Sequence, residues 1–177
     1  LDRAAARQQA VAGTLTRVID VDLDPFRHRL LLDQGSRAGL ARGDGLIDAF
    51  GVVGQISAVG PDSAFAILIT DPNHALPVEV SRNGVKSIAY GTGDASRLEL
   101  PNLPISIDIQ VGDRLLSTAV GGRFPPGIPV AEVTAIERPT DAAFAIAYAR
   151  PLSQLANNRE MLAVKPRPIA GPSADGG

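Results

Sequence analysis

The sequence predicts an all-β fold, and three observations support this prediction. Apolar and polar residues alternate within many short runs, and SIDIQV at 106–111, for example, places Ile107, Ile109 and Val111 on one face of a strand. Residues that favour turns recur about every 8 to 12 positions, a spacing typical of barrels and sandwiches. No amphipathic helical runs separate the strands, so antiparallel sheets are favoured over a parallel α/β sheet.

The N-terminal segment LDRAAARQQAVAG is the stretch that predicts a helix. It has no β-branched residue before Val11, and Gly13 follows where a helix C-cap would lie. A thin stripe at heptad spacing is formed by Leu1, Ala4, Gln8 and Val11. The segment is therefore either a frayed terminal helix or the end of a longer coiled coil.

Beyond this segment the apolar period changes to two, and about ten short strands are expected. In addition to SIDIQV they are LTRVIDVDL at 15–23, RLLLD at 29–33, LIDAFGVVGQISAV at 46–59, FAILIT at 65–70, LPVEV at 76–80, VKSIAY at 85–90, RLEL at 97–100, VAEVTAI at 130–136 and AFAIAYA at 143–149. The pair Asn83-Gly84 suits the positive φ angles of a type I′ turn, which predicts a hairpin over LPVEVSRNGVKSIAY.

A weak internal repeat suggests two related halves, although Gly-Asp turns are common in any β protein. ARGDGLIDAFGVVGQI and QVGDRLLSTAVGGRFPPGIPVAEV each place Gly-Asp before an apolar pair, a glycine turn and another strand. We expect the boundary near residue 100, where two prolines bracket a turn in LPNLP. The expected divisions are the end of a helix or coiled coil at 1–13, a first β-barrel region at 14–100, a second at 101–166 with strands free to cross between them, and a disordered Pro-, Gly- and Ser-rich tail at 167–177.

Composition disfavours several kinds of partner. The formal net charge is only −2 and no block of like charge occurs, so the basic footprint of a nucleic-acid-binding protein is missing. Aromatic residues make up 4% with no Trp, which disfavours stacking surfaces for sugars or bases. The chain has no Cys, which excludes disulfides and zinc–thiolate sites, and no stretch approaches the roughly 18 apolar residues of a spanning helix.

No group of residues predicts a catalytic, metal or cofactor site. His28 and His74, the only histidines, lie in turn-like settings without the spacing of metal ligands. Ser63 or Ser117 could be combined with a histidine and an aspartate into a hydrolase triad, but no Gly-x-Ser-x-Gly elbow is present. GTGDAS at 91–96 lacks the following helix and the lysine of a nucleotide-binding loop.

The segment VGDRLLSTAVGGRFPPGIPVAEV at 111–133 is rich in turn residues, with four glycines and three prolines between apolar runs. Its prolines restrict φ and its glycines permit turns, so the loop is expected to hold one shape and to lose little entropy on docking. Phe124 and Ile128 are apolar anchors if the loop faces a partner and core residues if it does not; the scarcity of aromatics favours the core for Phe124. The candidate partner-interface loop consists of Arg123, Phe124, Pro125, Pro126 and Ile128.

Three motifs in order resemble the rod shape-determining protein MreC family. They are LLLDQGSRAGLARGDGLI, GVVGQISAVGPDSAFAILITDPNHALPVEV and IQVGDRLLSTAVGGRFPPGIPVAEV, and the likeness runs from about Thr14 to Pro166. Two positions depart from the family pattern, because Ala119 and Ala131 stand where glycines are expected. If those glycines serve positive φ angles, the two alanines must lie in different turns.

The resemblance implies two small antiparallel barrels of the six-stranded type, exposed in the periplasm, with a coiled coil and an inner-membrane anchor upstream. It implies a non-catalytic scaffold of the bacterial elongation complex that controls cell shape, binds and activates the peptidoglycan transpeptidase and self-associates. The implied partners are the elongation-specific class B penicillin-binding transpeptidase, MreD, other elongation-complex proteins and a second copy of the chain in a dimer or filament. Two alternatives are a periplasmic adaptor of an efflux or secretion system, which predicts a returning helical hairpin, and a β-barrel hydrolase.

Overall fold

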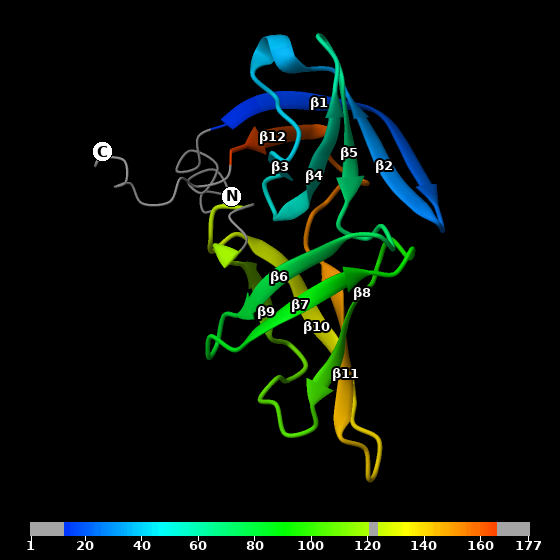
Figure 1. Ribbon diagram of the computed structural model, residues 1–177, viewed down its shortest axis with the longest axis vertical. Coiled ribbons are helices and arrows are strands. Elements are labelled where there is room, and N and C mark those ends of the chain that lie inside the picture. The colour runs from blue at the N-terminus through cyan, green and yellow to red at the C-terminus, as the bar shows by residue number, and fades with distance from the viewer. Residues whose placement is uncertain (1–12, 121–123, 166–177) are drawn as a thin grey trace, which may run out of the picture.

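The computed structural model describes residues 13–120 and 124–165, in which twelve strands form two closed barrels of six strands each (Figure 1). All their strand pairs are antiparallel. The predicted all-β fold of two six-stranded antiparallel barrels is therefore confirmed. No helix within the described ranges is long and apolar enough to cross a membrane.

The helix expected at the N-terminus and the tail expected at 167–177 lie outside the described residues, with one exception. Gly13 begins the first strand, so its predicted role as a helix C-cap is wrong. A Cβ atom at this position would clash with the backbone of Ala163, which explains why a glycine suits the first strand pair.

The first barrel has the strand order β1, β12, β3, β4, β5 and β2 around its wall. Its strands are β1 Gly13–Asp24, β2 Arg27–Leu32, β3 Gly45–Ile47, β4 Val52–Val59, β5 Ala64–Leu68 and β12 Glu160–Val164. A short 3₁₀ turn, η1 Ser36–Ala38, lies between β2 and β3.

The second barrel has the order β10, β11, β8, β7, β6 and β9. Its strands are β6 Ala75–Val80, β7 Lys86–Gly91, β8 Leu98–Pro104, β9 Arg114–Ser117, β10 Pro129–Glu137 and β11 Phe144–Pro151. The inward side of β11 carries three alanines, Ala145, Ala147 and Ala149, all fully buried. These small side chains leave the narrow interior to larger residues from the facing strands, because barrel interiors are filled by side chains.

The chain crosses between the barrels. It leaves the first barrel after β5, builds the whole second barrel, and then returns so that β12 pairs with β1 on one side and β3 on the other. The boundary expected near residue 100 differs from this pairing, because LPNLP lies inside β8. Asn102 has a φ of 59°, and the ladder to β11 is irregular there, which lets Pro101 and Pro104 lie in a strand.

The predicted hairpin is confirmed, but its turn type was wrong. β6 pairs with β7 from Ala75 opposite Tyr90 to Glu79 opposite Lys86. Only Gly84 in this turn has a positive φ, of 76°, so the connection is a four-residue loop and not a type I′ turn. Asn83 instead accepts a hydrogen bond from the Val85 amide, at 3.1 Å, which holds the loop.

SIDIQV is not a strand, so that prediction was also wrong. Its alternation agrees with burial only in part, since Ile109 is buried and Ile107 is half-buried, whereas Val111 is 63% exposed, like the polar residues of the segment. Its carbonyl groups are satisfied by side chains: Arg138 donates to Ile107 and Ile109, and Asn83 donates to Asp108. An alternating pattern indicates a half-buried extended segment, but pairing needs a neighbouring strand as well.

Two strands absent from the expected runs, β9 and β12, complete the barrels. β12 lacked an alternating pattern because residues 161–164 are all buried. Met161 and Ala163 belong to the core inside the first barrel, whereas Leu162 and Val164 belong to a second cluster that fills the other barrel and the junction. A strand covered on both faces is a continuous apolar run, which is hard to identify by period.

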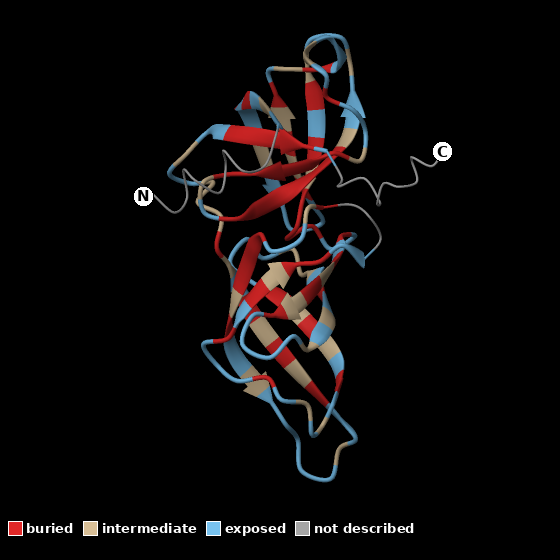
Figure 2. Ribbon diagram, turned by 90° about the vertical axis from the view of Figure 1, so that its left-hand side faces the viewer, coloured by how far each residue is buried: buried red, intermediate tan, exposed pale blue. Residues whose placement is uncertain are grey.

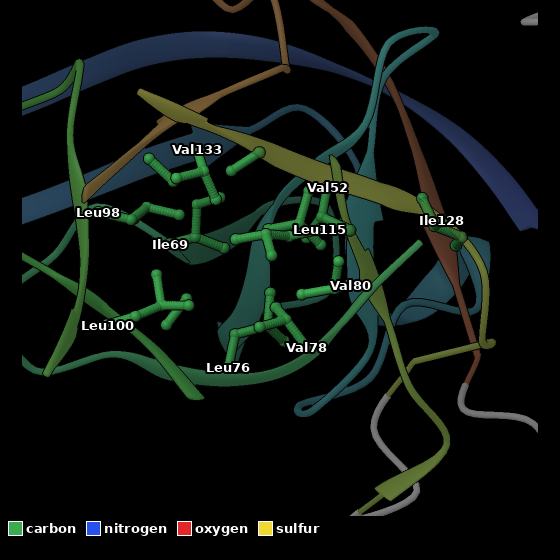
Figure 3. Close-up of a cluster of buried hydrophobic side chains, with 14 of the residues drawn as sticks. Val52, Ile69, Leu76, Val78, Val80, Leu98, Leu100, Leu115, Ile128 and Val133 are labelled. Carbon is green, nitrogen blue, oxygen red and sulfur yellow. The ribbon is translucent and has the colours of Figure 1, made fainter. Parts of the chain in front are cut away.

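The larger hydrophobic cluster therefore spans both barrels. It joins Ile47 and Val52 of the first barrel to Ile69 in the connection and to the interior of the second barrel, as Figure 3 shows for Val52 and Ile69. Strands at the junction are buried over most of their length, whereas strands further away alternate between buried and more exposed residues (Figure 2). The two barrels consequently form one packed unit.

Candidate functional site

The candidate partner-interface loop connects β9 to β10 and lies at the junction of the barrels. Phe124 and Ile128 are each 2% exposed, so both are core residues in this structure and not surface anchors. The Phe124 ring packs against Gly45 of β3, where a Cβ atom would lie 2.6 Å from the ring. Pro125 is half-buried, Pro126 is exposed, and Arg123 lies outside the described residues.

A single hydroxyl holds the described part of this loop. The Ser117 Oγ donates to the Pro125 carbonyl at 2.7 Å and accepts from the Ile128 amide at 3.0 Å. The Gly127 amide donates to the Ser117 carbonyl at 2.9 Å, and Gly127 has a φ of 86°, a value that glycine adopts without strain. These contacts hold residues 124–128 of the loop against the end of β9.

The two departures from the family pattern fit ordinary backbone conformations. Positive φ among the described non-glycine residues occurs at Asn102 and Asp141, so neither Ala119 nor Ala131 adopts it. Ala131 is fully buried within β10, opposite Leu115 of β9. Ala131 therefore lies in a strand and not in the altered turn that was expected, and Ala119 needs no positive φ.

Asp71 ties the connection between the barrels to the first barrel. Its side chain is fully buried and accepts hydrogen bonds from the amides of His28, at 2.8 Å, and Asn73, at 2.7 Å. The Arg29 guanidinium lies 3.5 Å from the same carboxylate. Backbone donors and a cation together compensate this buried charge, which would otherwise be costly.

Asp48 forms a second link across the junction. Its carboxylate accepts from the amides of Phe50 at 2.8 Å and Gly51 at 2.9 Å, and from the Gln154 amide in the β11–β12 connection at 2.6 Å. Burial raises the pKa of Asp48 because removal of water disfavours the charged form, and these three hydrogen bonds oppose that effect. The turn after β3 is thereby attached to the returning chain.

Arg82 anchors the base of the second barrel. Its guanidinium contacts Asp113 at 2.9 Å and Asp108 at 3.0 Å. The hydrogen bonds from Arg82 lower the pKa of both carboxyl groups, and the ion pairs raise the pKa of Arg82. Asp113 also accepts a hydrogen bond from the Gln110 amide at 2.8 Å. This cluster therefore holds both the β6–β7 turn and the SIDIQV segment at 106–111, which was expected to be a strand.

The residues considered for catalysis serve structural contacts. The Nδ1 of His28 lies 2.7 Å from the Thr70 hydroxyl, and the Nε2 of His74 lies 3.4 Å from the Gln55 amide oxygen. The Ser117 hydroxyl is engaged in its own loop. In the ranges 13–120 and 124–165 no three His, Asp or Glu side chains are grouped to hold a metal.

Accessible apolar side chains also line a groove outside this loop. A groove of about 680 Å³ runs beside the junction, between the end of β1, the loop after β7 and the connection from β11 to β12. Its accessible walls include Leu23 and Leu155, and Arg150 and Arg159 lie at the same groove. No local pattern in the sequence indicated this groove, because its residues come from segments far apart in the chain. We call this feature the junction groove.

Comparison with known proteins identifies the family. Residues 18–165 match the family described as rod shape-determining protein MreC, barrel core. The chain belongs to the MreC family. The resemblance drawn from the three sequence motifs is therefore confirmed.

Relatives in this family are cell shape-determining proteins. The chain is 40% identical over 152 residues to the MreC of Haemophilus influenzae, covering 86% of this chain and 43% of that protein. It is also 40% identical over 148 residues to the MreC of Escherichia coli K12, covering 84% and 40%. The chain thus spans about two fifths of the length of these relatives.

Solved structures of MreC share both barrels. The crystal structure of MreC from Pseudomonas aeruginosa superposes with a TM-score of 0.82 at 38% identity, over 86% of this chain and 99% of that one. A structure described as a complex between the penicillin-binding protein PBP2 and MreC from Helicobacter pylori has a TM-score of 0.68 at 20% identity, over 89% and 99%. At that identity the second likeness concerns the fold.

Proposed function

We propose that this chain is a non-catalytic periplasmic scaffold that binds the elongation-specific penicillin-binding transpeptidase and favours its active conformation. The observation that carries this proposal is that an MreC of the same fold forms a complex with a penicillin-binding protein. The finer elements of the proposal, which are activation, self-association, contact with MreD and an upstream inner-membrane anchor, follow from the family resemblance. Catalysis would then reside in the partner.

The architecture suits such a role. Both barrels share one hydrophobic cluster, and buried carboxylates link them across the junction. A rigid body presents a preformed surface and loses little conformational entropy on docking. Binding shifts the partner between two states only to the extent that the scaffold binds one state better. The family membership gives no support to an efflux adaptor, and the geometry around Ser117 gives none to a hydrolase.

The test is a titration of the chain against the purified periplasmic region of the transpeptidase. We expect saturable binding together with a higher rate of peptide cross-linking as the chain is added. A parallel sedimentation series on the chain alone measures self-association. Saturable binding without a change in rate would contradict activation, whereas no binding over the whole series would contradict the scaffold role.

A further inference from the structure

The junction groove is formed by both barrels and by the chain that joins them. β1 contributes Val21 and Leu23, the loop after β7 contributes Ala95 and Ser96, and the other lining residues come from β4, the end of β5 and the segment after it, β11 and the β11–β12 connection. Figure 1 shows this connection passing from the lower barrel to the upper one. A ligand in the groove would therefore contact both halves of the molecule at once.

The accessible walls of the groove are apolar. Leu23 is 45% exposed, although leucine is a residue that usually contributes to a core. Leu155 and Val21 are both half-buried, and both pack against the core of the first barrel. Apolar side chains gathered in a concave surface favour binding, because burying them removes their area from water.

The charge of the groove is positive. Its lining includes Arg150 and Arg159 and contains no Asp or Glu. Arg150 is paired with Glu132 at 3.2 Å, outside the lining. The Arg159 side chain makes no ion pair or hydrogen bond with the described residues, so its charge is uncompensated beside an apolar surface. A carboxylate that reaches Arg159 would form a charge-assisted pair.

We propose that the junction groove docks an apolar segment of the transpeptidase that carries a carboxylate opposite Arg159. This inference rests on the proposed scaffold function and assigns it a surface. The apolar walls select aliphatic side chains, and the single unpaired guanidinium selects an acidic residue beside them. A phosphate-bearing ligand fits less well, because anions of that charge are usually held by several cations.

The test compares four variants in the same titration against the periplasmic region of the transpeptidase. Arg159→Glu reverses the charge at the groove, and Ala156→Trp fills the groove from an exposed position in its lining. Their matched controls are Arg42→Glu and Ala143→Trp, at exposed positions outside the groove. Circular dichroism verifies that every variant keeps its β-sheet signal, and sedimentation of each variant measures self-association.

We expect each groove variant to weaken binding on the order of tenfold or more, and each control to leave it within about twofold. The affinity of the unaltered chain should also fall as salt rises, whereas the affinity of Arg159→Glu should rise with salt, because salt then screens a repulsion between two carboxylates. Unchanged binding in both groove variants would overturn the docking surface while leaving the scaffold role intact. Loss of self-association with unchanged transpeptidase binding would assign the groove to a second copy, and absence of binding by the unaltered chain would overturn both proposals.

Discussion

At the scale of single residues, buried and half-buried charges hold the irregular parts of this fold. Asp71 and Asp48 fix the junction, and Arg82 with Asp113 fixes the base of the second barrel. Each of these carboxylates accepts a hydrogen bond from at least one backbone amide, and each also faces a cation or a turn. These residues replace ladder hydrogen bonds where the chain leaves regular strands, because buried backbone groups need partners.

Replacement of Asp113 by asparagine should reveal this contribution through its pH dependence. Because Arg82 lowers the pKa of Asp113 below its ordinary 3.8, the ionised form stabilises the fold above that pH and the stabilisation is lost as the pH falls below it. Near neutral pH, Asp113→Asn should lower the free energy of unfolding by about 1–2 kcal/mol, and at about pH 2 the difference should be smaller.

Urea unfolding of the unaltered chain and the variant at both pH values measures this difference. Asp62→Asn is the control, because Asp62 and its partner Arg37 are both about three-quarters exposed and a surface pair contributes little. A stability gap for Asp113→Asn that is as large in acid as at neutral pH would contradict the assigned role.

At the scale of elements, the β9–β10 loop has a structural role in the described residues. Its glycine- and proline-rich sequence suggested a preformed docking loop, but Phe124 and Ile128 pack inward. Phe124 fills the space left by Gly45, so an element of the second barrel closes onto β3 of the first. The exposed residues of the described loop are Ala119 and Val120 on one side and Pro126 and Gly127 on the other.

Truncation of Phe124 should therefore act on stability. Phe124→Ala removes a buried ring at the junction and should cost about 3–5 kcal/mol of unfolding free energy, as large-to-small core changes do. Pro126→Ala, at an exposed position of the same loop, should change it by less than about 1 kcal/mol. Chemical unfolding measures both values, and a Phe124→Ala variant as stable as the parent would show that the ring is not part of the core.

At the scale of the whole molecule, the return of β12 and the shared cluster join two barrels into one unit. β12 closes the first barrel between β1 and β3, and its opposite face supplies Leu162 and Val164 to the cluster that fills the second barrel. A cut through the junction would therefore expose apolar side chains of both barrels. Units that share a core in this way unfold together.

We expect the two barrels to unfold in a single transition. The only tyrosines, Tyr90 and Tyr148, lie in β7 and β11, so tyrosine absorbance reports on the second barrel. Phe65 lies half-exposed in β5, and a Phe65→Trp variant adds a fluorescent reporter for the first barrel. Coincident midpoints for both signals and for far-ultraviolet circular dichroism are expected, whereas separate midpoints would show that the barrels unfold independently.

The sequence by itself determined the all-β class, the positions of most strands, the hairpin around Asn83-Gly84 and the family. These features are local, because a period of two and a turn pair are visible within a few residues. The local pattern misled where no neighbouring strand was available for pairing, as in SIDIQV. It was missing where a strand is covered on both faces, as in β12.

Only the tertiary structure decided which barrel each strand joins, that Phe124 faces inward, and where an accessible groove lies. β12 pairs with β1 across almost the whole described chain, and the junction groove collects side chains from both ends of it. Such contacts depend on strand order and register, which follow from how the complete set of apolar faces is buried. The physical reason is that burial is a property of the whole packed chain, whereas periodicity is a property of each segment.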